Sequence, residues 1–388
     1  MRTLAYCSRM RFQRQITGIE YGKSNYPAYD AADLGFREYW YPVAFSGGLR
    51  RTPLAVTLLG EELCLVRDTD GKVYCLSDRC AHRGIPLSEG RQEFPGTITC
   101  PYHGWTYRLG SGEVVAALTD GPDSPLCGKI RIRTYPAQER AGLVWVYVGD
   151  EPPPPVERDI PEEFLREDAL VLGRMTVRDG DWRHAAENGF DEGHAKYLHR
   201  TSLFMFFRRV PAWSRTRVMT DADGVWISRV QDQIGFETEY PGLGRWPQFH
   251  FWHRRGGGPQ TSIRLPGTLR VKYPDWIDFE WYVPVRPGKH LYVQLAVVHV
   301  SGLPALFFRL KYWAYLRPIF HGQFNDQDTW MVRLMRTPPE RLYRPDVSII
   351  AWRKLAETAR GLRARGPAEI GGVREQTTEA EVPEESRA

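Results

Sequence analysis

The sequence predicts an α+β fold of two domains, an all-β domain first and then a domain in which strands precede long helices. The chain has 388 residues, which exceeds two typical domains of about 150 residues each. Short runs rich in β-branched and aromatic residues fill residues 36–149, whereas long helical stretches appear only near the end of the chain. With 42% hydrophobic and 13% aromatic residues, the composition excludes a disordered or fibrous protein.

The first domain is expected at residues 34–150, after an N-terminal extension over residues 1–33 that has no sustained periodicity. Runs such as LAVTLLG, KVYCLSD and GLVWVYVGD are separated by Gly, Asp and Pro, which is typical of short strands joined by turns. The segment EPPPPVERDIP follows, and its consecutive prolines favour an extended connection. Residues 151–164 are therefore predicted to be a Pro-rich linker.

The second domain is expected at residues 165–365. It contains one helix-like stretch at 182–198, and its strand-like stretches lie at 225–230, 268–273, 279–285 and 291–300. Two further helical stretches follow, at 303–334 and 348–362. Residues 366–388 are rich in Gly, Glu and Arg and almost free of aromatic residues, which predicts a disordered tail.

The charge and hydropathy patterns exclude two classes of protein. The net charge of +5 comes from 52 basic and 47 acidic residues, a surplus too small and dispersed for a nucleic-acid-binding surface. No stretch reaches the roughly 18 uncharged apolar residues of a membrane span, since even residues 303–320 contain Arg309, Lys311 and Arg317. We therefore expect no nucleic-acid partner, no transmembrane segment and a cytoplasmic location.

Six cysteines in a chain of this length are too few for a disulfide framework. Two of them belong to the first group of candidate metal ligands described next. The others have no partner at ligand spacing and are expected to be buried free thiols; they are Cys7, Cys64, Cys75 and Cys127.

Two pairs of candidate metal ligands lie in the first domain, Cys80-x-His82 and Cys100-x-x-His103, with seventeen residues between His82 and Cys100. Each pair supplies one thiolate and one imidazole, which bind zinc or an iron–sulfur cluster. A Cys₂His₂ zinc site usually takes two cysteines from one half and two histidines from the other, whereas here each half is Cys then His. That order matches a Rieske [2Fe-2S] centre, in which one iron is bound by two cysteines and the other by two histidines. A structural zinc knuckle is the alternative.

A second group of candidate ligands lies in DWRHAAENGFDEGHAKYLHR, which contains Asp191, His194 and His199. Two histidines and one carboxylate form the facial triad of non-haem Fe(II) oxygenases. His194 and His199 are about 140° apart around a regular helix, so the helix must end, bulge or unwind between residues 193 and 198 if both bind one metal. The upstream cluster favours a metal here, because an electron-transfer centre needs an acceptor.

The carboxylate ligand is expected from a later part of the chain. In HGQFNDQDTWMVR, Asp326 and Asp328 compete for this role, and Asp328 is favoured over the alternative that both only cap or solvate a helix. Asp191 then can accept a hydrogen bond from a ligand imidazole and fix its tautomer, or it can bridge toward a cluster histidine. The other histidines considered are expected to be structural: His184, His250 and His253.

Two segments combine apolar and basic residues, LFMFFRR at 203–209 and LFFRLKYWAYLR at 306–317. The first expectation is a core helix whose basic side chains extend to solvent. The alternative is a hydrophobic substrate entrance or a contact with a membrane surface, which would suit a polycyclic substrate.

At these motifs the chain resembles the Rieske non-haem iron oxygenases, specifically their catalytic α subunits, and is most similar to the terminal oxygenase components of carbazole dioxygenases. The matching segments include LGFREYWYPV, KVYCLSDRCAHRG, TITCPYHGWTYR, ENGFD, FEWYVPV, FNDQD and IIAWRKLA, and they span residues 33 to 357 in the family's order. The resemblance implies that a [2Fe-2S] cluster is bound by Cys80, His82, Cys100 and His103. It also implies that a mononuclear Fe(II) is bound by His194, His199 and Asp328.

The resemblance further implies a fold, an assembly and partners. The fold is a Rieske domain joined to a helix-grip catalytic domain, in which an antiparallel sheet curves around a long helix. The assembly is a head-to-tail homotrimer, in which the cluster of one subunit serves the iron of its neighbour through Asp191. Electrons come from NAD(P)H through a ferredoxin or a flavoprotein reductase, since this sequence has no complete G-x-G-x-x-G motif after a strand. The implied reaction is O₂-dependent hydroxylation of a hydrophobic aromatic or polycyclic substrate.

The alternative function is a Rieske-type electron-transfer or metal-binding protein without oxygenase activity. Such a carrier needs only the first domain, whereas this chain adds about 200 residues with a candidate iron triad. Iron content separates the two functions, because a carrier holds about two irons per chain and an oxygenase about three.

Overall fold

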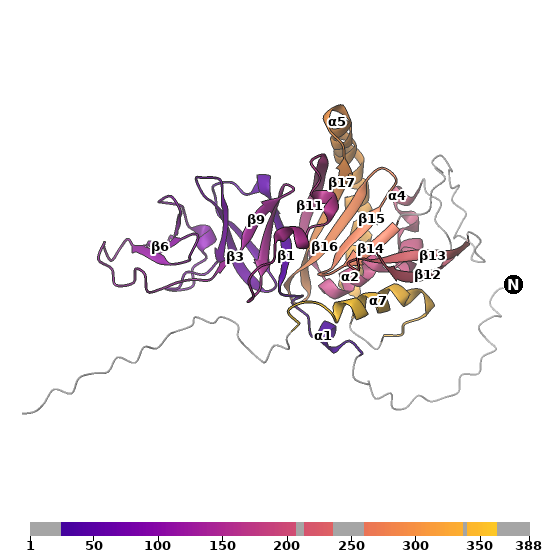
Figure 1. Ribbon diagram of the computed structural model, residues 1–388, viewed down its shortest axis with the longest axis horizontal. Helices are drawn as coiled ribbons and strands as arrows, with labels where there is room; N and C mark the ends of the chain where they lie inside the picture. Colours follow the sequence, from indigo (N-terminus) through magenta and orange to yellow (C-terminus); the bar gives the residue numbers. More distant parts are fainter. Residues whose placement is uncertain (1–24, 207–212, 236–259, 337–339, 363–388) are drawn as a thin grey trace, which may run out of the picture.

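The computed structural model describes residues 25–206, 213–235, 260–336 and 340–362. In Figure 1 the small sheets of the first half lie to one side, and a large twisted sheet with most of the helices lies to the other. Helices and antiparallel sheets are both present, so the predicted α+β class is confirmed. None of the described helices is long and apolar enough to cross a membrane. Several residues discussed above lie outside the described residues: Cys7, His250, His253 and the predicted tail at 366–388.

The first half of the chain forms three small antiparallel sheets. One has the order β1 (Tyr39–Phe45), β10 (Leu143–Val148) and β9 (Ala137–Arg140). The next has the order β2 (Leu54–Leu58), β3 (Glu61–Arg67), β4 (Val73–Ser77) and β8 (Thr134–Tyr135). The last, at the outer end in Figure 1, contains β5 (Thr97–Thr99), β6 (Trp105–Arg108) and β7 (Val114–Ala117). The short 3₁₀ turns here are η1 (Ser46–Gly48) and η2 (Leu87–Glu89).

The second half is built on one seven-stranded antiparallel sheet. Its strand order is β11 (Ala169–Asp179), β17 (Lys289–His299), β16 (Ile277–Arg286), β15 (Thr268–Lys272), β14 (Gln260–Arg264), β13 (Ile227–Gly235) and β12 (Trp213–Thr220). The four predicted strand-like stretches correspond to β13, β15, β16 and β17. The sequence analysis missed β11, β12 and β14. In β11 the pattern is interrupted by Gly173, where the neighbouring strand comes so close that a Cβ would lie 2.2 Å from the Gln294 carbonyl oxygen.

A continuous helical rod lies against this sheet. It runs through α5 (Gly302–Lys311), η6 (Tyr312–Phe324) and α6 (Asn325–Leu334). The predicted stretch at 303–334 is therefore helical throughout, but its middle part is a π-helix. Pro318 lies inside that part, and its missing N–H group disfavours regular α-helical hydrogen bonding there.

The other helices are shorter. α2 (Trp182–Phe190) lies against β14, β15 and β16, and α7 (Val347–Ala356), which is shorter than the predicted stretch at 348–362, lies against β12 and β13. The remaining helical segments are α1 (Pro27–Asp30), η3 (Val156–Arg158), η4 (Glu162–Phe164), α3 (Gly193–Tyr197), η5 (Leu198–Thr201), α4 (Leu203–Phe206) and η7 (Arg344–Asp346).

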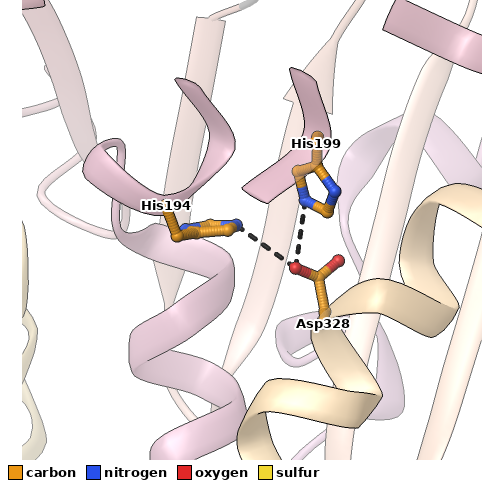
Figure 2. Close-up of side chains that lie close together, drawn as sticks. All are labelled: His194, His199 and Asp328. Atoms are coloured by element: carbon orange, nitrogen blue, oxygen red, sulfur yellow. Dashed lines mark ion pairs between the residues drawn. The ribbon is translucent and has the colours of Figure 1, made fainter. Parts of the chain in front are cut away.

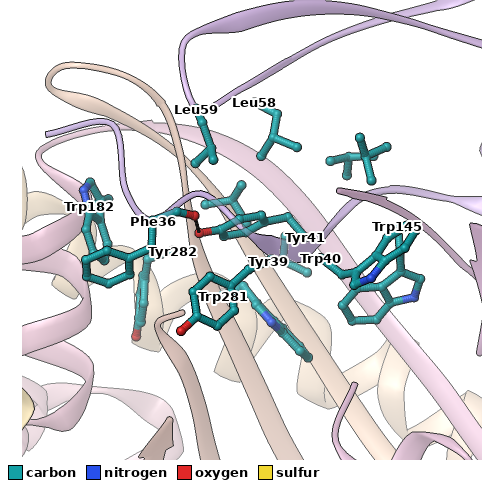
Figure 3. Close-up of a cluster of buried hydrophobic side chains, with 14 of the residues drawn as sticks. Phe36, Tyr39, Trp40, Tyr41, Leu58, Leu59, Trp145, Trp182, Trp281 and Tyr282 are labelled. Atoms are coloured by element: carbon teal, nitrogen blue, oxygen red, sulfur yellow. Dashed lines mark hydrogen bonds between the residues drawn. The ribbon is translucent and has the colours of Figure 1, made fainter. Parts of the chain in front are cut away.

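A hydrophobic core joins the two halves of the chain, as Figure 3 shows. The ring centroids of Trp145 in β10 and Trp281 in β16 are 5.8 Å apart. Phe164, at the end of the Pro-rich segment, packs on Trp281 at 5.7 Å. In the same segment the Asp159 carboxylate accepts a hydrogen bond of 3.0 Å from the backbone N–H of Trp40. The Pro-rich segment is thus fixed between the two halves by buried contacts.

The sheet also carries a buried polar network that reaches the helical rod. Glu280 of β16 accepts a hydrogen bond from Asn325 Nδ2 (2.8 Å) and is hydrogen-bonded to Tyr282. Two residues before Glu280, Asp278 Oδ1 lies 3.1 Å from His321 Nε2. Burial, helped by Asp278, raises the pKa of Glu280 to about 8, and burial lowers the pKa of His321 to about 3. Both side chains are therefore neutral at pH 7, which avoids the high cost of a buried charge.

We expect Glu280→Gln to stabilise the protein relative to the wild type more at pH 8 than at pH 5. In the unfolded chain this carboxyl ionises near pH 4.5, but in the folded protein it stays protonated up to about pH 8, so wild-type stability falls as the pH rises through this range. Glutamine cannot ionise, so the difference in the free energy of unfolding should grow by roughly 1–3 kcal/mol.

Urea unfolding at the two pH values measures this difference. Glu93→Gln, at an exposed position, is the control and should give no such change with pH. A Glu280→Gln effect that is the same at both pH values would contradict a neutral Glu280.

Candidate metal centres

Two similar loops bring the first group of candidate ligands together. In each loop the backbone N–H of a glycine donates to the carbonyl of the cysteine four residues earlier, Gly84 to Cys80 at 2.8 Å and Gly104 to Cys100 at 3.1 Å. Both glycines have φ near +69°, a conformation that glycine adopts without the strain of a Cβ. Each loop therefore turns sharply within two residues of its histidine.

The side chains of these loops meet at the outer end of the first half. Cys80 and Cys100 are buried, and Cys80 Sγ lies 3.1 Å from the Tyr107 hydroxyl. The ring centroids of His82 and His103 are 4.6 Å apart. Within the described residues, His103 Nδ1 is buried and has no hydrogen-bond partner. Because buried polar atoms are nearly always satisfied, this nitrogen fits a metal ligand.

The spacing of the four side chains argues against a single metal ion. Throughout the described part of the chain, one group of three His, Cys, Asp or Glu residues has its ligand atoms all within 4.8 Å of one another, and this group is His194, His199 and Asp328. A zinc ion would bring its four ligand atoms closer together than that. Two thiols and two imidazoles with wider spacing fit a cluster of two irons.

The second group of candidate ligands lies at an interruption of the helix. Asp181 caps the start of α2 by accepting a hydrogen bond of 2.9 Å from the Arg183 N–H, and α2 ends at Phe190. Asp191 has extended backbone (ψ 138°), and a new helix, α3, begins at Gly193. The predicted change in the helix is present, since α3 ends at Tyr197 and a 3₁₀ helix begins at Leu198, and a further interruption lies earlier, at residues 191–192.

The reason for this earlier interruption is a local capping interaction. The Asp191 carboxylate accepts hydrogen bonds from the backbone N–H groups of Gly193 (2.8 Å) and His194 (2.9 Å). These are donors that the first turn of a helix leaves unpaired, and Asp is well suited to satisfy them. Asp191 and His194 therefore do not lie on one continuous helix.

Two imidazoles and one carboxylate meet beside this interruption, as Figure 2 shows. His194 Nε2 lies 3.3 Å and His199 Nε2 lies 3.0 Å from Asp328 Oδ1. His194 comes from α3, His199 from η5 and Asp328 from α6. Two histidines and a carboxylate around one point are the donor set of a mononuclear iron site with open coordination positions, so these residues fit such an iron.

The second nitrogen of each imidazole is held by a neighbouring side chain. His194 Nδ1 lies 3.2 Å from the Asp191 carboxylate, and His199 Nδ1 lies 2.9 Å from Gln327 Oε1. With Nδ1–H donating to these oxygens, Nε2 of each ring points to the site, which is the usual support for histidine ligands.

Two supporting residues, Gln327 and Asn188, were not predicted. Asn188 Nδ2 donates a hydrogen bond of 3.1 Å to Asp328 Oδ1. The available signals were weak: Gln327 directly precedes Asp328, and Asn188 lies one turn before Asp191 on α2.

The electrostatics of the site depend on these contacts. Burial would raise the pKa of Asp191, but hydrogen bonds from the His194 ring and from the N–H groups of His194 and Gly193 lower it to about 2. Burial would lower the pKa of His194, but Asp191 and Asp328 raise it to about 9. Although burial opposes this effect, His199 and His194 hold the pKa of Asp328 well below its usual range. A metal ion bound at His194 Nε2 therefore replaces a proton.

The competing acid, Asp326, faces another way. Its carboxylate lies 3.1 Å from an Arg174 guanidinium nitrogen and 2.7 Å from one of Arg178, and half of it is exposed. It thus forms a surface ion-pair cluster and does not contact either histidine. His184 lies on α2 and is likewise not part of the group around Asp328.

Of the three other cysteines that the structure describes, two are buried free thiols, as expected. Cys64 and Cys75 are fully buried, and burial raises the pKa of both thiols, which makes them unreactive. Cys127 is free but only partly buried.

Known proteins are similar to this chain over most of its length. The family profile described as "Rieske [2Fe-2S] domain" matches residues 39–136, and the profile described as "Homotrimeric ring hydroxylase" matches residues 147–212 and 226–363. The terminal oxygenase component of carbazole 1,9a-dioxygenase from Metapseudomonas resinovorans is 37% identical over 357 residues, which covers 84% of this chain and 92% of that protein. The corresponding component from a Sphingomonas species is 36% identical and covers 84% of this chain and 93% of that protein.

Solved structures give the same result. The terminal oxygenase of carbazole 1,9a-dioxygenase from Nocardioides aromaticivorans has a TM-score of 0.77 at 33% identity, with 87% of this chain and 99% of that chain covered. The oxygenase in a reduced complex with ferredoxin from a carbazole 1,9a-dioxygenase has a TM-score of 0.74 at 34% identity, with 87% of this chain and 93% of that chain covered.

We expect Asp328→Ala to remove the iron bound beside His194 and His199, while the two irons of the cluster remain. The iron content of anaerobically purified protein should fall from about three to about two per chain, with about two acid-labile sulfides retained. The matched control is Asp326→Ala, which changes an acid on the same helix and should keep about three irons. Equal iron contents in the two variants would contradict a metal site at Asp328.

Proposed function

This chain belongs to the homotrimeric ring-hydroxylase family of Rieske oxygenases, and on that premise we propose that it is the terminal oxygenase component of a multicomponent oxygenase. It uses O₂ and electrons from separate NAD(P)H-linked redox proteins to hydroxylate a hydrophobic aromatic or polycyclic substrate. The observation that carries this proposal is the convergence of His194, His199 and Asp328 in a chain that also has the two Cys/His loops.

The domain that accepts electrons is the Rieske domain, which we assign to residues 34–150. Cys80 and Cys100 would bind one iron of the [2Fe-2S] cluster, and His82 and His103 the other. Because neutral imidazoles carry less negative charge than thiolates, histidine ligation raises the reduction potential of the cluster. Residues 151–164 connect this domain to the catalytic domain, which we assign to residues 165–365.

In the catalytic domain, His194, His199 and Asp328 would hold a mononuclear Fe(II). The iron, when bound, supplies the place where O₂ is activated with electrons from the cluster. The protein's own part is to orient the ligands: Asp191 and Gln327 fix the two imidazoles, and Asn188 holds Asp328 by its hydrogen bond to Oδ1.

Asp191 has a second role in this proposal, as the bridge for electrons. Its carboxylate touches His194 Nδ1 on one side, and it is partly exposed on the other. Tyr343, which is also exposed, has its hydroxyl close to Gly193, beside Asp191. A cluster histidine from a neighbouring subunit can therefore approach Asp191 from the protein surface.

The surroundings of His199 favour a flat, apolar substrate. The Phe324 ring stacks on the His199 ring with centroids 3.8 Å apart, and Phe204 lies 5.2 Å from Phe324. Tyr273 and Trp276 extend this aromatic cluster. These rings are largely buried and packed on one another. In the proposal, the substrate binds against the edge of this cluster by offset stacking and edge contacts, and the cluster keeps water away from the iron.

The proposed partners are a ferredoxin as electron donor and two further copies of this chain. The related oxygenase has been solved in complex with ferredoxin, and the matching family is described as homotrimeric. Around the cluster loops, His82, Tyr102 and Leu118 are exposed, which leaves this end accessible to a partner protein. A cytoplasmic location, where NAD(P)H is available, is part of the proposal.

The test is a reconstituted reaction with a reductase and a ferredoxin from a carbazole dioxygenase system. NADH, isotopically labelled O₂ and carbazole or another polycyclic aromatic compound are supplied, and the products are examined by mass spectrometry. We expect hydroxylated product that carries oxygen from O₂. Reduction of the cluster without labelled product from any substrate tested, together with only about two irons per chain, would identify an electron carrier instead.

We expect Asp191→Asn to slow electron transfer between the metal centres while leaving both centres in place. Loss of the carboxylate charge removes the strong partner of His194, and changes of this kind typically lower activity about 10- to 100-fold. The measurement is the rate of cluster reoxidation after O₂ is mixed with the reduced, substrate-loaded protein. Asp179→Asn, at an exposed residue paired with Lys289, is the control and should reoxidise at the wild-type rate. Normal reoxidation in Asp191→Asn would exclude the bridging role.

A further inference from the structure

Helix α5 and the first two residues of η6, Tyr312 and Trp313, form one helical segment with two sides of different character. The side toward the body of the protein carries Ala305, Phe308 and Tyr312, which are spaced by three or four residues and pack into a hydrophobic cluster with the sheet. The outer side carries five large apolar residues that are 52–71% exposed: Leu303, Leu306, Phe307, Leu310 and Trp313. We call these five residues the α5 apolar face. In Figure 1 the helix projects from the body of the protein.

The sequence around this face is unusual for a helix in water. From Leu303 to Trp313 the five positions are three, one, three and three residues apart, which places them on one side of the helix. A side that faces solvent normally carries charged residues of both signs, but residues 302–324 contain no acidic residue. The expected core helix at 306–317 thus describes only the inner side of this segment, and none of the described residues covers the outer side.

The basic residues near this face argue against a lipid surface. Lys311 Nζ lies 2.9 Å from Asp275 Oδ2, and the Arg317 guanidinium lies over the Trp313 ring at 4.4 Å. Only Arg309 remains as a third basic residue along α5 and η6. Membrane-surface helices instead carry rows of Lys and Arg that face anionic headgroups. The charge pattern therefore favours an apolar protein surface as the partner.

The size of the face fits a contact between subunits. At roughly 200 Å² for a large side chain, the exposed parts of the five residues amount to about 600 Å². This is most of the roughly 800 Å² that each partner contributes to a standard protein interface. Contiguous apolar patches of this size usually mark interaction sites.

We propose that the α5 apolar face binds a second copy of this chain and stabilises the homotrimer. The inference rests on the proposed function, because the homotrimeric assembly follows from the family. The face is separate from the surface around Asp191, since Leu306 and Asp328 are 22 residues apart on one helical rod, or about 30 Å. The α5 apolar face would add to the contact between the copies, and the surface around Asp191, where the neighbouring cluster approaches, would receive electrons.

The test is the full-length, metal-loaded protein with Leu306→Glu and Leu310→Glu combined. Two carboxylates in an apolar contact are costly to desolvate, so we expect the molar mass from light scattering to fall from three times the chain mass to the chain mass of 44.7 kDa. The electron paramagnetic resonance spectrum of the reduced cluster and the iron content should stay at wild-type values. Turnover with ferredoxin should fall in proportion to the trimer fraction.

The matched control places the same charges elsewhere. Met219→Glu and Val225→Glu change apolar residues that are 44% and 45% exposed and lie in the hairpin of β12 and β13, and this variant should remain a trimer. A trimeric Leu306→Glu/Leu310→Glu variant would overturn the proposal. So would wild-type protein that sediments with vesicles of phosphatidylcholine and phosphatidylglycerol when the variant does not, because that result assigns the face to a lipid surface.

A milder variant decides the question if the charged variant loses its cluster spectrum and has therefore not folded. Leu310→Cys with a nitroxide label should give an immobilised spectrum in the trimer, and a freely mobile label in an intact trimer would refute the proposal. Failure of the proposed function has a different signature, namely a wild-type trimer that lacks the third iron or yields no hydroxylated product.

Discussion

The carboxylate of Asp328 lies against two imidazoles from a much earlier part of the chain. This contact requires the helical rod to be fixed relative to α3 and η5, which carry the histidines. The distances of 3.0 and 3.3 Å to His199 and His194 leave little room for movement. A shift of α6 by a fraction of a turn would separate the carboxylate from both rings. Much of the catalytic half serves to prevent such a shift.

The buried network on the sheet provides this support. Asn325, one turn before Asp328 on α6, donates to Glu280 and to the Tyr292 hydroxyl, which ties the rod to β16 and β17. His321 adds a contact with Asp278 from the preceding turn. Because burial keeps Glu280 and His321 neutral at pH 7, these contacts act as directional hydrogen bonds without unpaired buried charges. The sheet thereby fixes the position of the helical rod along its axis, and with it the position of Asp328 relative to the two histidines.

The sequence predicted the local features of the candidate sites well, because short-range spacing determines them. The order Cys, His, Cys, His within two short loops and the spacing of His194 and His199 can be read directly. The contacts that distinguish Asp328 from Asp326 exist only in the folded chain. Arg174 and Arg178 on β11 bind Asp326, and β11 was not predicted as a strand. Gln327 and Asn188 were missed because their roles depend on elements that meet only in the folded chain. The early end of α2 was missed because a carboxylate cap, and not the helical period, decides it.

The central claim is that one chain holds two chemically different iron centres. Mössbauer spectroscopy of isotopically enriched protein tests this claim most directly, because it distinguishes iron sites by their ligands and counts them. We expect a pair of inequivalent cluster irons, one bound by thiolates and one by imidazoles, and a separate high-spin ferrous site with about one third of the total signal. A spectrum with the cluster pair alone, or with neither component, would contradict it.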